Sequence, residues 1–199
     1  MMKLAFLASN NGSGLRAIVA AIAGGDLAAE ARLVVSNRRS APALAFAGVA
    51  GIPVACIPTS ADPQAVDARL AEALTRSGAD LVILSGYLRK LGPATLRAFE
   101  GRILNIHPAL LPKFGGQGMY GRHVHEAVVA AGERESGATV HVVDDEYDHG
   151  PIVAQSHVAL APGETAESLE KRVTATEPRL FVETLQKLAT GTLSLPKPL

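Results

Sequence analysis

The chain has 199 residues, 48% hydrophobic and 19% charged, and its formal net charge is +0 because 19 basic side chains balance 19 acidic ones. A chain of this length buries about 70% of the surface that it exposes when unfolded, so it can form a hydrophobic core without disulfides or metal. The one cysteine, Cys56, excludes an internal disulfide framework and any site with several cysteine ligands. The zero net charge argues against binding to nucleic acid or to membrane surfaces. We therefore expect a cytoplasmic globular protein.

Short apolar runs alternate with longer amphipathic runs along the chain. The apolar runs predict strands at residues 3–8, 32–36, 54–57, 81–85, 103–106, 139–143 and 152–158. The amphipathic runs predict helices at residues 14–23, 41–50, 63–76, 93–99, 123–131 and 165–189. Within the last helix Pro178 has no N–H to donate, so we expect either a kink or the start of a second helix there.

The order of these elements indicates the fold class. Strands and helices alternate in the first half, which is typical of a parallel sheet that helices cover on both faces. We expect an α/β fold, with a Rossmann-like, mostly parallel twisted sheet in a single domain over residues 1–199. Residues 1–100 would form a nucleotide-binding-like half, and residues 101–199 would carry the catalytic loops. Ligands of such sheets bind beyond the carboxyl ends of the strands, so the loops there are candidate sites.

The loop Ser9-Asn10-Asn11-Gly12-Ser13-Gly14 joins the first predicted strand to the first predicted helix. Its small residues let backbone N–H groups approach a ligand, and the N-terminus of the helix adds partial positive charge. The loop matches neither a Walker loop nor the full G-x-G-x-x-G pattern. It is therefore either an anion site suited to phosphate or only a well-capped helix start.

The fifth predicted strand leads into Asn105-Ile106-His107-Pro108. Residues i and i+2 of a strand point to the same face, so Asn105 and His107 project together at its carboxyl tip. An amide that stabilises an oxyanion, beside an imidazole that moves protons near neutral pH, suits acyl transfer; a structural histidine is the alternative. No recognisable serine or cysteine nucleophile accompanies them, which favours direct transfer between two bound substrates.

Four carboxylates occur within Asp144-Asp145-Glu146-Tyr147-Asp148-His149-Gly150. A calcium loop would need glycine at its sixth position and glutamate at its twelfth, and the sequence has neither. One carboxylate directed at His107 would raise the pKa of that imidazole and fix its orientation, whereas a solvated acidic turn explains some of the other residues. Weaker signals are the pair His123 and His125, which would diverge on a helix, and residues 85–91, which suit a flat heteroaromatic ligand.

Together these segments resemble the folate-dependent formyltransferases, over residues 4 to about 185. The most specific segments are Gly101-Arg-Ile-Leu-Asn-Ile-His-Pro-Ala-Leu-Leu-Pro112, Ser136-Gly-Ala-Thr-Val-His141 and Asp145-Glu-Tyr-Asp-His-Gly-Pro151. Residues 113–121 resemble one bacterial branch of the members that formylate glycinamide ribonucleotide. Members that formylate tRNA or hydrolyse formyltetrahydrofolate share the Asn-x-His-Pro motif but carry a further domain, for which we expect no room in this chain.

The resemblance implies the formyltransferase fold and transfer of the formyl group of 10-formyltetrahydrofolate to the primary amine of glycinamide ribonucleotide, without metal or ATP. It implies small-molecule substrates, no nucleic-acid or membrane partner, and a monomer or weak homodimer. The implied catalytic residues are His107 as acid and base, Asn105 as hydrogen-bond donor to the oxyanion, and Asp148 as the carboxylate that raises the pKa of His107. The residues implied to bind the ribonucleotide are Gly12, Ser13, Gly14, Thr174, Ala175, Thr176 and Glu177. Those implied to line the folate site are Leu88, Arg89, Lys90, Leu91, Asn105, Asp144, Asp145, Glu146, Tyr147 and Asp148.

Three segments depart from the usual pattern of the family. Its phosphate loop usually reads Ser-Gly-Asn-Gly-Ser-Asn, whereas this chain has Asn10 and Gly14 at the second and last positions. An arginine that often reaches the folate is missing from Asp62-Pro63-Gln64, and Glu177 is followed by Pro178. Alternatives with the same chemistry are formylation of an amino sugar or tRNA and hydrolysis of formyltetrahydrofolate. A non-catalytic binding module is the alternative from a different class.

Overall fold

The computed structural model describes residues 1–196 and shows one sheet of seven strands. The strands are β1 (Met2–Leu7), β2 (Ala29–Ser36), β3 (Val54–Cys56), β4 (Leu81–Leu84), β5 (Ile103–His107), β6 (Glu135–Val142) and β7 (Ile152–Ala159). The helices are α1 (Ser13–Ala23), α2 (Pro42–Val49), α3 (Pro63–Arg76), α4 (Pro93–Ala98), α5 (Arg122–Ala130) and α6 (Ala166–Ala189). Each predicted strand and helix is confirmed. β6 begins earlier than predicted because Glu135, Ser136 and Gly137, which carry no strand pattern of their own, pair with β7.

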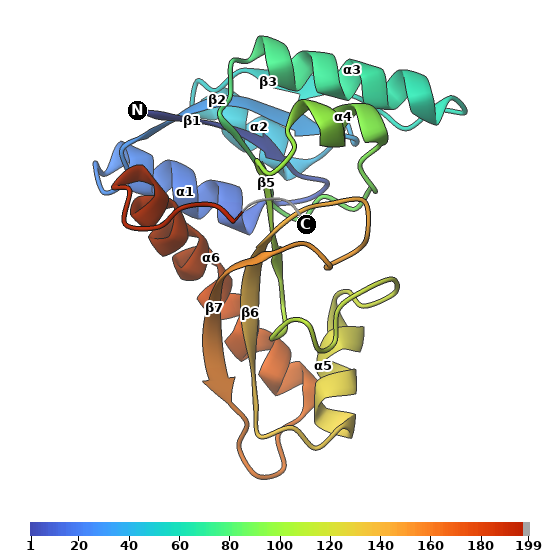
Figure 1. Ribbon diagram of the computed structural model, residues 1–199, viewed down its shortest axis with the longest axis vertical. Helices are drawn as coiled ribbons and strands as arrows, with labels where there is room; N and C mark the ends of the chain where they lie inside the picture. The colour runs from blue at the N-terminus through green and yellow to red at the C-terminus, as the bar shows by residue number, and fades with distance from the viewer. Residues whose placement is uncertain (197–199) are drawn as a thin grey trace.

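The strands follow the order β3-β2-β1-β4-β5-β6-β7. β1 to β5 run parallel, and β6 is antiparallel to both β5 and β7, which confirms the mostly parallel sheet. Successive side chains of a strand point to opposite faces: Leu4 and Phe6 of β1 lie in one buried cluster, and Ala5 and Leu7 lie in a second. Helices α1, α2, α5 and α6 contribute to the first cluster and α3 to the second, so helices cover both faces (Figure 1).

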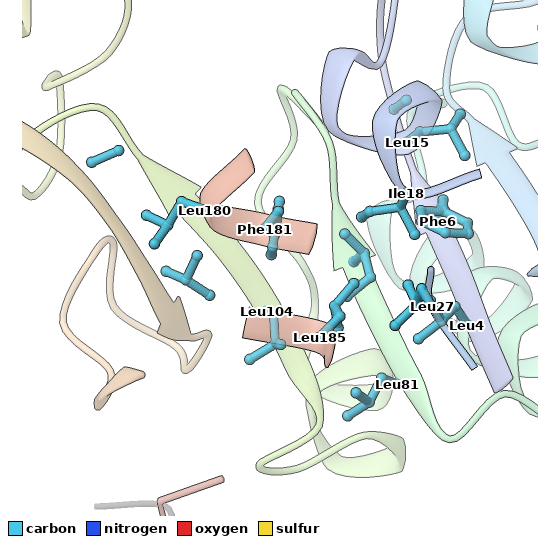
Figure 2. Packing of buried hydrophobic residues seen from close by; sticks show 14 of the residues in the cluster. Leu4, Phe6, Leu15, Ile18, Leu27, Leu81, Leu104, Leu180, Phe181 and Leu185 are labelled. Carbon is cyan, nitrogen blue, oxygen red and sulfur yellow. The ribbon is translucent and has the colours of Figure 1, made fainter. Parts of the chain in front are cut away.

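Helix α6 runs unbroken through Pro178, so the predicted start of a second helix at this residue is wrong. Buried side chains hold both halves of the helix against the core. Val173 lies before the proline, and Phe181 and Leu185 lie after it (Figure 2). This packing outweighs the loss of one backbone hydrogen bond at Pro178. Within residues 1–196, no helix combines the length and the apolar character that crossing a membrane would require.

β1 and β4 are neighbours in the sheet, but the chain continues from β1 to β2 toward one edge of the sheet and from β4 to β5 toward the other edge. Hydrogen bonds join the two loops that follow them: Ser9 N–H donates to the Gly86 carbonyl oxygen at 3.0 Å, and Leu88 N–H donates to Ser9 Oγ at 2.8 Å. Such a point, where the strand order reverses, is the ligand site of open parallel sheets. Because β5 is the next strand along, its carboxyl end lies at the same edge.

Candidate active site

Two antiparallel strands bring four polar side chains together at this edge. In the register of β5 and β6, Asn105 lies opposite His141 and His107 lies opposite Thr139. Directly opposed residues of an antiparallel pair share a face of the sheet, as do residues i and i+2 of one strand. Asn105 and His107 therefore project together, as the sequence predicts, and β6 adds a second histidine to the same face.

Both ring nitrogens of His107 have partners. Nε2 lies 2.7 Å from the carbonyl oxygen of Phe114, and Nδ1 lies 3.3 Å from Oδ2 of Asp148. A carbonyl oxygen only accepts hydrogen bonds, so Nε2 carries a proton and donates it to Phe114. Nδ1 is therefore the nitrogen that gains and loses a proton, and it faces the carboxylate.

Burial and charge oppose each other at this pair. Burial lowers the pKa of His107 and outweighs the carboxylate of Asp148, which raises it, so the net direction is below the usual value. Asp148 thus raises the pKa of His107, as the sequence predicts, but burial determines the net direction of the pKa. For Asp148, burial alone would raise the pKa, but His141, His107 and the N–H of Gly116 outweigh it and hold that pKa below its usual value. A neutral imidazole beside an ionised carboxylate results near neutral pH.

His141 is a residue of the catalytic cluster that the sequence analysis missed. Its side chain is buried, with Nε2 3.1 Å from Nδ2 of Asn105 and 3.5 Å from Oδ1 of Asp148. Its Nδ1–H donates to the carbonyl oxygen of Val142 at 2.9 Å. The signal that identifies it is the pairing of the strands at residues 103–107 and 135–142, because only that pairing places His141 opposite Asn105.

The backbone is left-handed at the two residues that contact His107. Phe114 has φ 56° and Asp148 has φ 54°, and they are the non-glycine residues with positive φ within residues 1–196. Gly115 lets the two segments meet, because a Cβ there would lie 2.5 Å from Leu111 Cδ2 and 3.1 Å from Asp148 Cβ. Such backbone strain costs about 1–3 kcal/mol per residue and is typical of functional sites. The surroundings thus hold both partners of the imidazole in place.

A pocket of about 90 Å³ opens beside these residues. Most residues predicted for the folate site line it, but Leu88 and Asp145, which are exposed, do not. Lys90 lies over the ring of Tyr147, with Nζ 5.5 Å from the ring centroid. The pocket therefore lies between the loop after β4 and the acidic loop. Its lining consists of Leu84, Tyr87, Arg89, Lys90, Leu91, Asn105, His141, Val143, Asp144, Glu146, Tyr147 and Asp148.

Hydrogen bonds within the acidic loop, residues 144–150, hold its side chains together. Asp144 Oδ2 lies 2.8 Å from His149 Nδ1, and Glu146 N–H donates to Asp144 Oδ1 at 3.0 Å. The hydrogen bond and the charge of Asp144 raise the pKa of His149. Within residues 1–196, no group of His, Cys, Asp and Glu side chains has an arrangement that could hold a metal ion. Asp148 alone of this loop turns inward to His107.

The two histidines of helix α5 diverge as predicted. His123 is exposed and lies 3.1 Å from Glu126, whereas His125 is buried. The segment Asp62-Pro63, which stands where the family often has an arginine, starts helix α3: the side chain of Asp62 accepts a hydrogen bond from Ala65 N–H at 3.0 Å.

The predicted phosphate loop leads into α1 at Gly12, whose φ is 66°. Gly12 has no side chain to cap this helix, and Leu15 N–H donates to Ser85 Oγ at 2.9 Å. The N–H groups of Ser13 and Gly14, which have no partner within residues 1–196, are therefore the ones available to a ligand. Gly14 packs against Phe181 of α6, and Glu177 lies one helical turn before Phe181 on the same face. The loop and Glu177 therefore lie at the same contact between α1 and α6.

Burial of the Glu177 carboxyl group raises its pKa to about 7. Thr176 Oγ1 lies 3.1 Å from Ser156 Oγ of β7, whereas Thr174 and Ala175 are exposed on α6. The N–H groups of Thr174, Ala175 and Thr176 lie inside helix α6, so only backbone carbonyl groups are available to a ligand there. The carbonyl oxygen of Thr174 lacks its usual hydrogen-bond donor, because Pro178 has no N–H.

Comparisons with known proteins identify the family of this chain. The formyl transferase family model matches residues 2–185. The chain is 42% identical over 185 residues to the chloroplastic phosphoribosylglycinamide formyltransferase of Arabidopsis thaliana, covering 91% of this chain and 63% of the plant protein. It is 34% identical over 196 residues to the phosphoribosylglycinamide formyltransferase of Escherichia coli, covering 98% of this chain and 90% of that protein. The chain thus spans less than two thirds of the plant relative and most of the bacterial one.

A solved structure shares both the sequence pattern and the fold. The crystal structure of glycinamide ribonucleotide transformylase 1 from Symbiobacterium toebii superposes with a TM-score of 0.89 at 35% identity, covering 98% of this chain and 91% of that chain. The family match extends over the strands, the histidine segment and the acidic loop described above. The chain therefore belongs to the formyl transferase family.

Proposed function

We propose that this chain transfers the formyl group of 10-formyltetrahydrofolate to the primary amine of glycinamide ribonucleotide. The observation that carries the proposal is that Asn105 and Asp148 line one pocket, with Nδ1 of the buried His107 3.3 Å from the carboxylate of Asp148. An amide donor, a neutral imidazole and an ionised carboxylate are the groups that acyl transfer to an amine requires. The family membership and the names of its relatives support the choice of substrates.

The reaction begins when the amine nitrogen attacks the formyl carbon. A carbon–nitrogen bond forms, and the electron pair of the C=O double bond moves onto the oxygen. Asn105 Nδ2 has two N–H groups; one donates to His141, which leaves the second for this oxyanion. A donor held in place before the reaction stabilises the charge without reorganisation, which lowers the barrier.

His107 then moves the proton. Its lowered pKa keeps Nδ1 unprotonated in the resting enzyme, so Nδ1 can take the proton that the attacking nitrogen releases, by way of the Asp148 carboxylate that lines the pocket. The imidazolium that forms is stabilised by Asp148 and adds positive charge beside the oxyanion. The intermediate collapses when the bond from the carbon to the folate nitrogen breaks and this nitrogen takes up the proton. The formyl donor is already activated, so the reaction needs neither ATP nor metal.

The two substrates would occupy opposite sides of His107. The first N–H groups of α1, at Gly12, Ser13 and Gly14, suit the phosphate of the ribonucleotide. Glu177, at the contact of α6 with this loop, suits the glycinamide end. The pocket between the loop after β4 and the acidic loop suits the flat ring of the folate, because apolar side chains such as Leu84 and Leu91 line it together with polar ones such as Asn105.

An acceptor assay tests this function. Purified protein is incubated with 10-formyltetrahydrofolate, with and without glycinamide ribonucleotide, and the release of tetrahydrofolate is followed. We expect rapid release only with the ribonucleotide, and a formylated product by mass spectrometry. Release of formate without any amine would assign a hydrolase. Transfer to an amino sugar or to tRNA alone would assign another acceptor, and the absence of turnover with every acceptor would reject an enzymatic role.

A further inference from the structure

Two arginines hold the loop between β1 and α1. Arg38, which follows β2, donates from Nη1 to Oδ1 of Asn10 at 2.6 Å. Arg16, in α1, donates from Nε to the carbonyl oxygen of Asn11 at 3.1 Å and lies over the ring of Phe46. Two guanidinium groups thus lie beside the loop that is proposed to bind phosphate.

The position of Arg38 is fixed from several sides. The carbonyl oxygen of Asn10 accepts a hydrogen bond from Ala43 N–H at 3.1 Å, which holds the residue that anchors the guanidinium. Ser9 Oγ donates to Oδ1 of Asn37 at 2.7 Å, which joins the loop to the segment that carries Arg38. Although Arg38 is exposed, its head group is therefore ordered before any ligand arrives, and an ordered side chain loses less entropy on binding.

The charge of this region is not compensated. Within residues 1–196, no carboxylate forms an ion pair with Arg16 or Arg38, and neither residues 1–25 nor residues 36–61 contain an aspartate or a glutamate. Other arginines of the chain do pair with a glutamate: Arg32, Arg76, Arg122, Arg172 and Arg179. A fixed guanidinium without a counter-charge attracts an anion.

The loop itself has no side chain to offer at its last position. A Cβ at Gly14 would lie 3.2 Å from Ser85 Oγ and 3.3 Å from Phe181 Cδ1, so the packing of α6 leaves little room for a larger residue. A polar side chain at this position would have to displace one of these neighbours. A donor that takes the place of a side chain at Gly14 must therefore come from outside the loop, and Arg38 is the exposed cation that the loop already holds.

We propose that Arg38, held in place by Asn10, binds the phosphate group of the acceptor together with the N–H groups at Gly12–Gly14. The identity of the acceptor rests on the proposed function, whereas the phosphate site rests on the loop and its arginine. A guanidinium has five N–H donors, and the bond to Asn10 uses one of them, so pairs of donors remain for phosphate oxygens. Arg38 thereby determines specificity for phosphorylated acceptors.

Steady-state kinetics test the role of Arg38. We expect Arg38→Ala to raise KM for glycinamide ribonucleotide about tenfold, the effect of losing one charge-assisted hydrogen bond, and to leave KM for the dephosphorylated riboside unchanged. Arg39→Ala is the matched control, because Arg39 is exposed and forms no side-chain hydrogen bond or ion pair within residues 1–196. Equal effects of Arg38→Ala on both acceptors, or an unchanged KM for the ribonucleotide, would overturn the proposal.

A double-mutant cycle tests the role of Asn10. We expect Asn10→Ala to raise KM for the ribonucleotide in the wild-type background and to have little further effect in the Arg38→Ala background. Additive effects would show that Asn10 does not act through Arg38 and would contradict this part of the proposal.

Calorimetric titration with ribose 5-phosphate separates the phosphate site from the proposed function. If no acceptor is formylated but Arg38→Ala still weakens binding of ribose 5-phosphate about tenfold, the proposed function is wrong and the phosphate site stands. If formyl transfer is normal but Arg38→Ala changes neither KM nor this affinity, the phosphate role of Arg38 is wrong and the function stands.

Discussion

The side chains of Asn105 and His141 face each other across β5 and β6, with Nδ2 of the amide 3.1 Å from Nε2 of the imidazole. Nδ1 of His141 donates to the carbonyl oxygen of Val142, so a ring with one proton offers Nε2 as an acceptor. With the ring in that form, the amide of Asn105 turns its nitrogen, and not its oxygen, toward His141. This contact fixes the direction in which the second N–H of the amide points.

Replacement of His141 tests this positioning role. We expect His141→Ala to lower kcat about tenfold, less than the 100- to 1,000-fold loss that follows removal of an oxyanion donor, as in Asn105→Ala. KM for both substrates should change little. In the Asn105→Ala background His141→Ala should cause no further loss of kcat. His157→Ala on β7 is the control, because His157 is exposed and lies 3.2 Å from Glu135. Equal losses in His157→Ala and His141→Ala would contradict the positioning role.

Replacement of Asp148 tests its coupling to His107. The carboxylate raises the pKa of His107 against the effect of burial, so Asp148→Asn should lower that pKa further. If Nδ1 must be unprotonated to accept a proton, the acid limb of the pH–kcat profile moves to lower pH. Titration of the His107 ring by NMR measures the same shift directly. Asp145→Asn is the control, since Asp145 is exposed and does not contact the ring. An unmoved acid limb in Asp148→Asn would reject the coupling.

The buried carboxyl group of Glu177 predicts a pH dependence of stability. Its pKa is raised from 4.5 to about 7 in the folded chain. A group whose pKa is raised on folding stabilises the protein fully below its unfolded pKa, and this stabilisation is lost as the pH rises through the folded pKa. Glu177→Gln removes this titration, so its free energy of unfolding should fall less between about pH 4.5 and pH 8.

Urea denaturation at a series of pH values measures this difference. Glu183→Gln, an exposed position on the same helix, should keep the wild-type slope. If Glu177→Gln and wild type lose stability equally over this range, the carboxyl group is not buried in the way described.

The size of the pocket predicts that its walls move. A volume of about 90 Å³ is well below the roughly 300–1,000 Å³ of pockets that hold drug-sized ligands. The acidic loop, residues 144–150, and the loop after β4 must therefore separate to admit a folate. We expect tetrahydrofolate to slow amide hydrogen exchange in both loops and to leave the amides of β1 unchanged. Unchanged exchange in residues 144–150 at saturating tetrahydrofolate would contradict this opening.

Local sequence patterns are enough to predict the strands and helices, and also the two catalytic candidates on β5, Asn105 and His107. Asn105 and His107 are separated by one residue of a strand, and the period of a strand alone places them on one face. Of the two alternatives predicted at Pro178, a kink or the start of a second helix, the second fails because a local rule does not contain the buried contacts of Val173 and Phe181, which hold α6 together.

Long-range contacts explain what the sequence analysis missed. His141 enters the site only through the register of β5 with β6, and Arg38 reaches Asn10 across 28 positions of the chain. Likewise, the net direction of the His107 pKa depends on how deeply the fold buries the ring, which a carboxylate in the sequence does not reveal.

The left-handed backbone at Asp148 also limits which residues can replace it. With φ at 54°, this position suits aspartate, asparagine and glycine, whose short or missing side chains tolerate that region. Glutamate retains the negative charge but fits this conformation less well, and its longer arm would have to fit between His107 and His141. Charge conservation is therefore the wrong guide to tolerated variation here: asparagine, although neutral, preserves the architecture of the loop better than glutamate does.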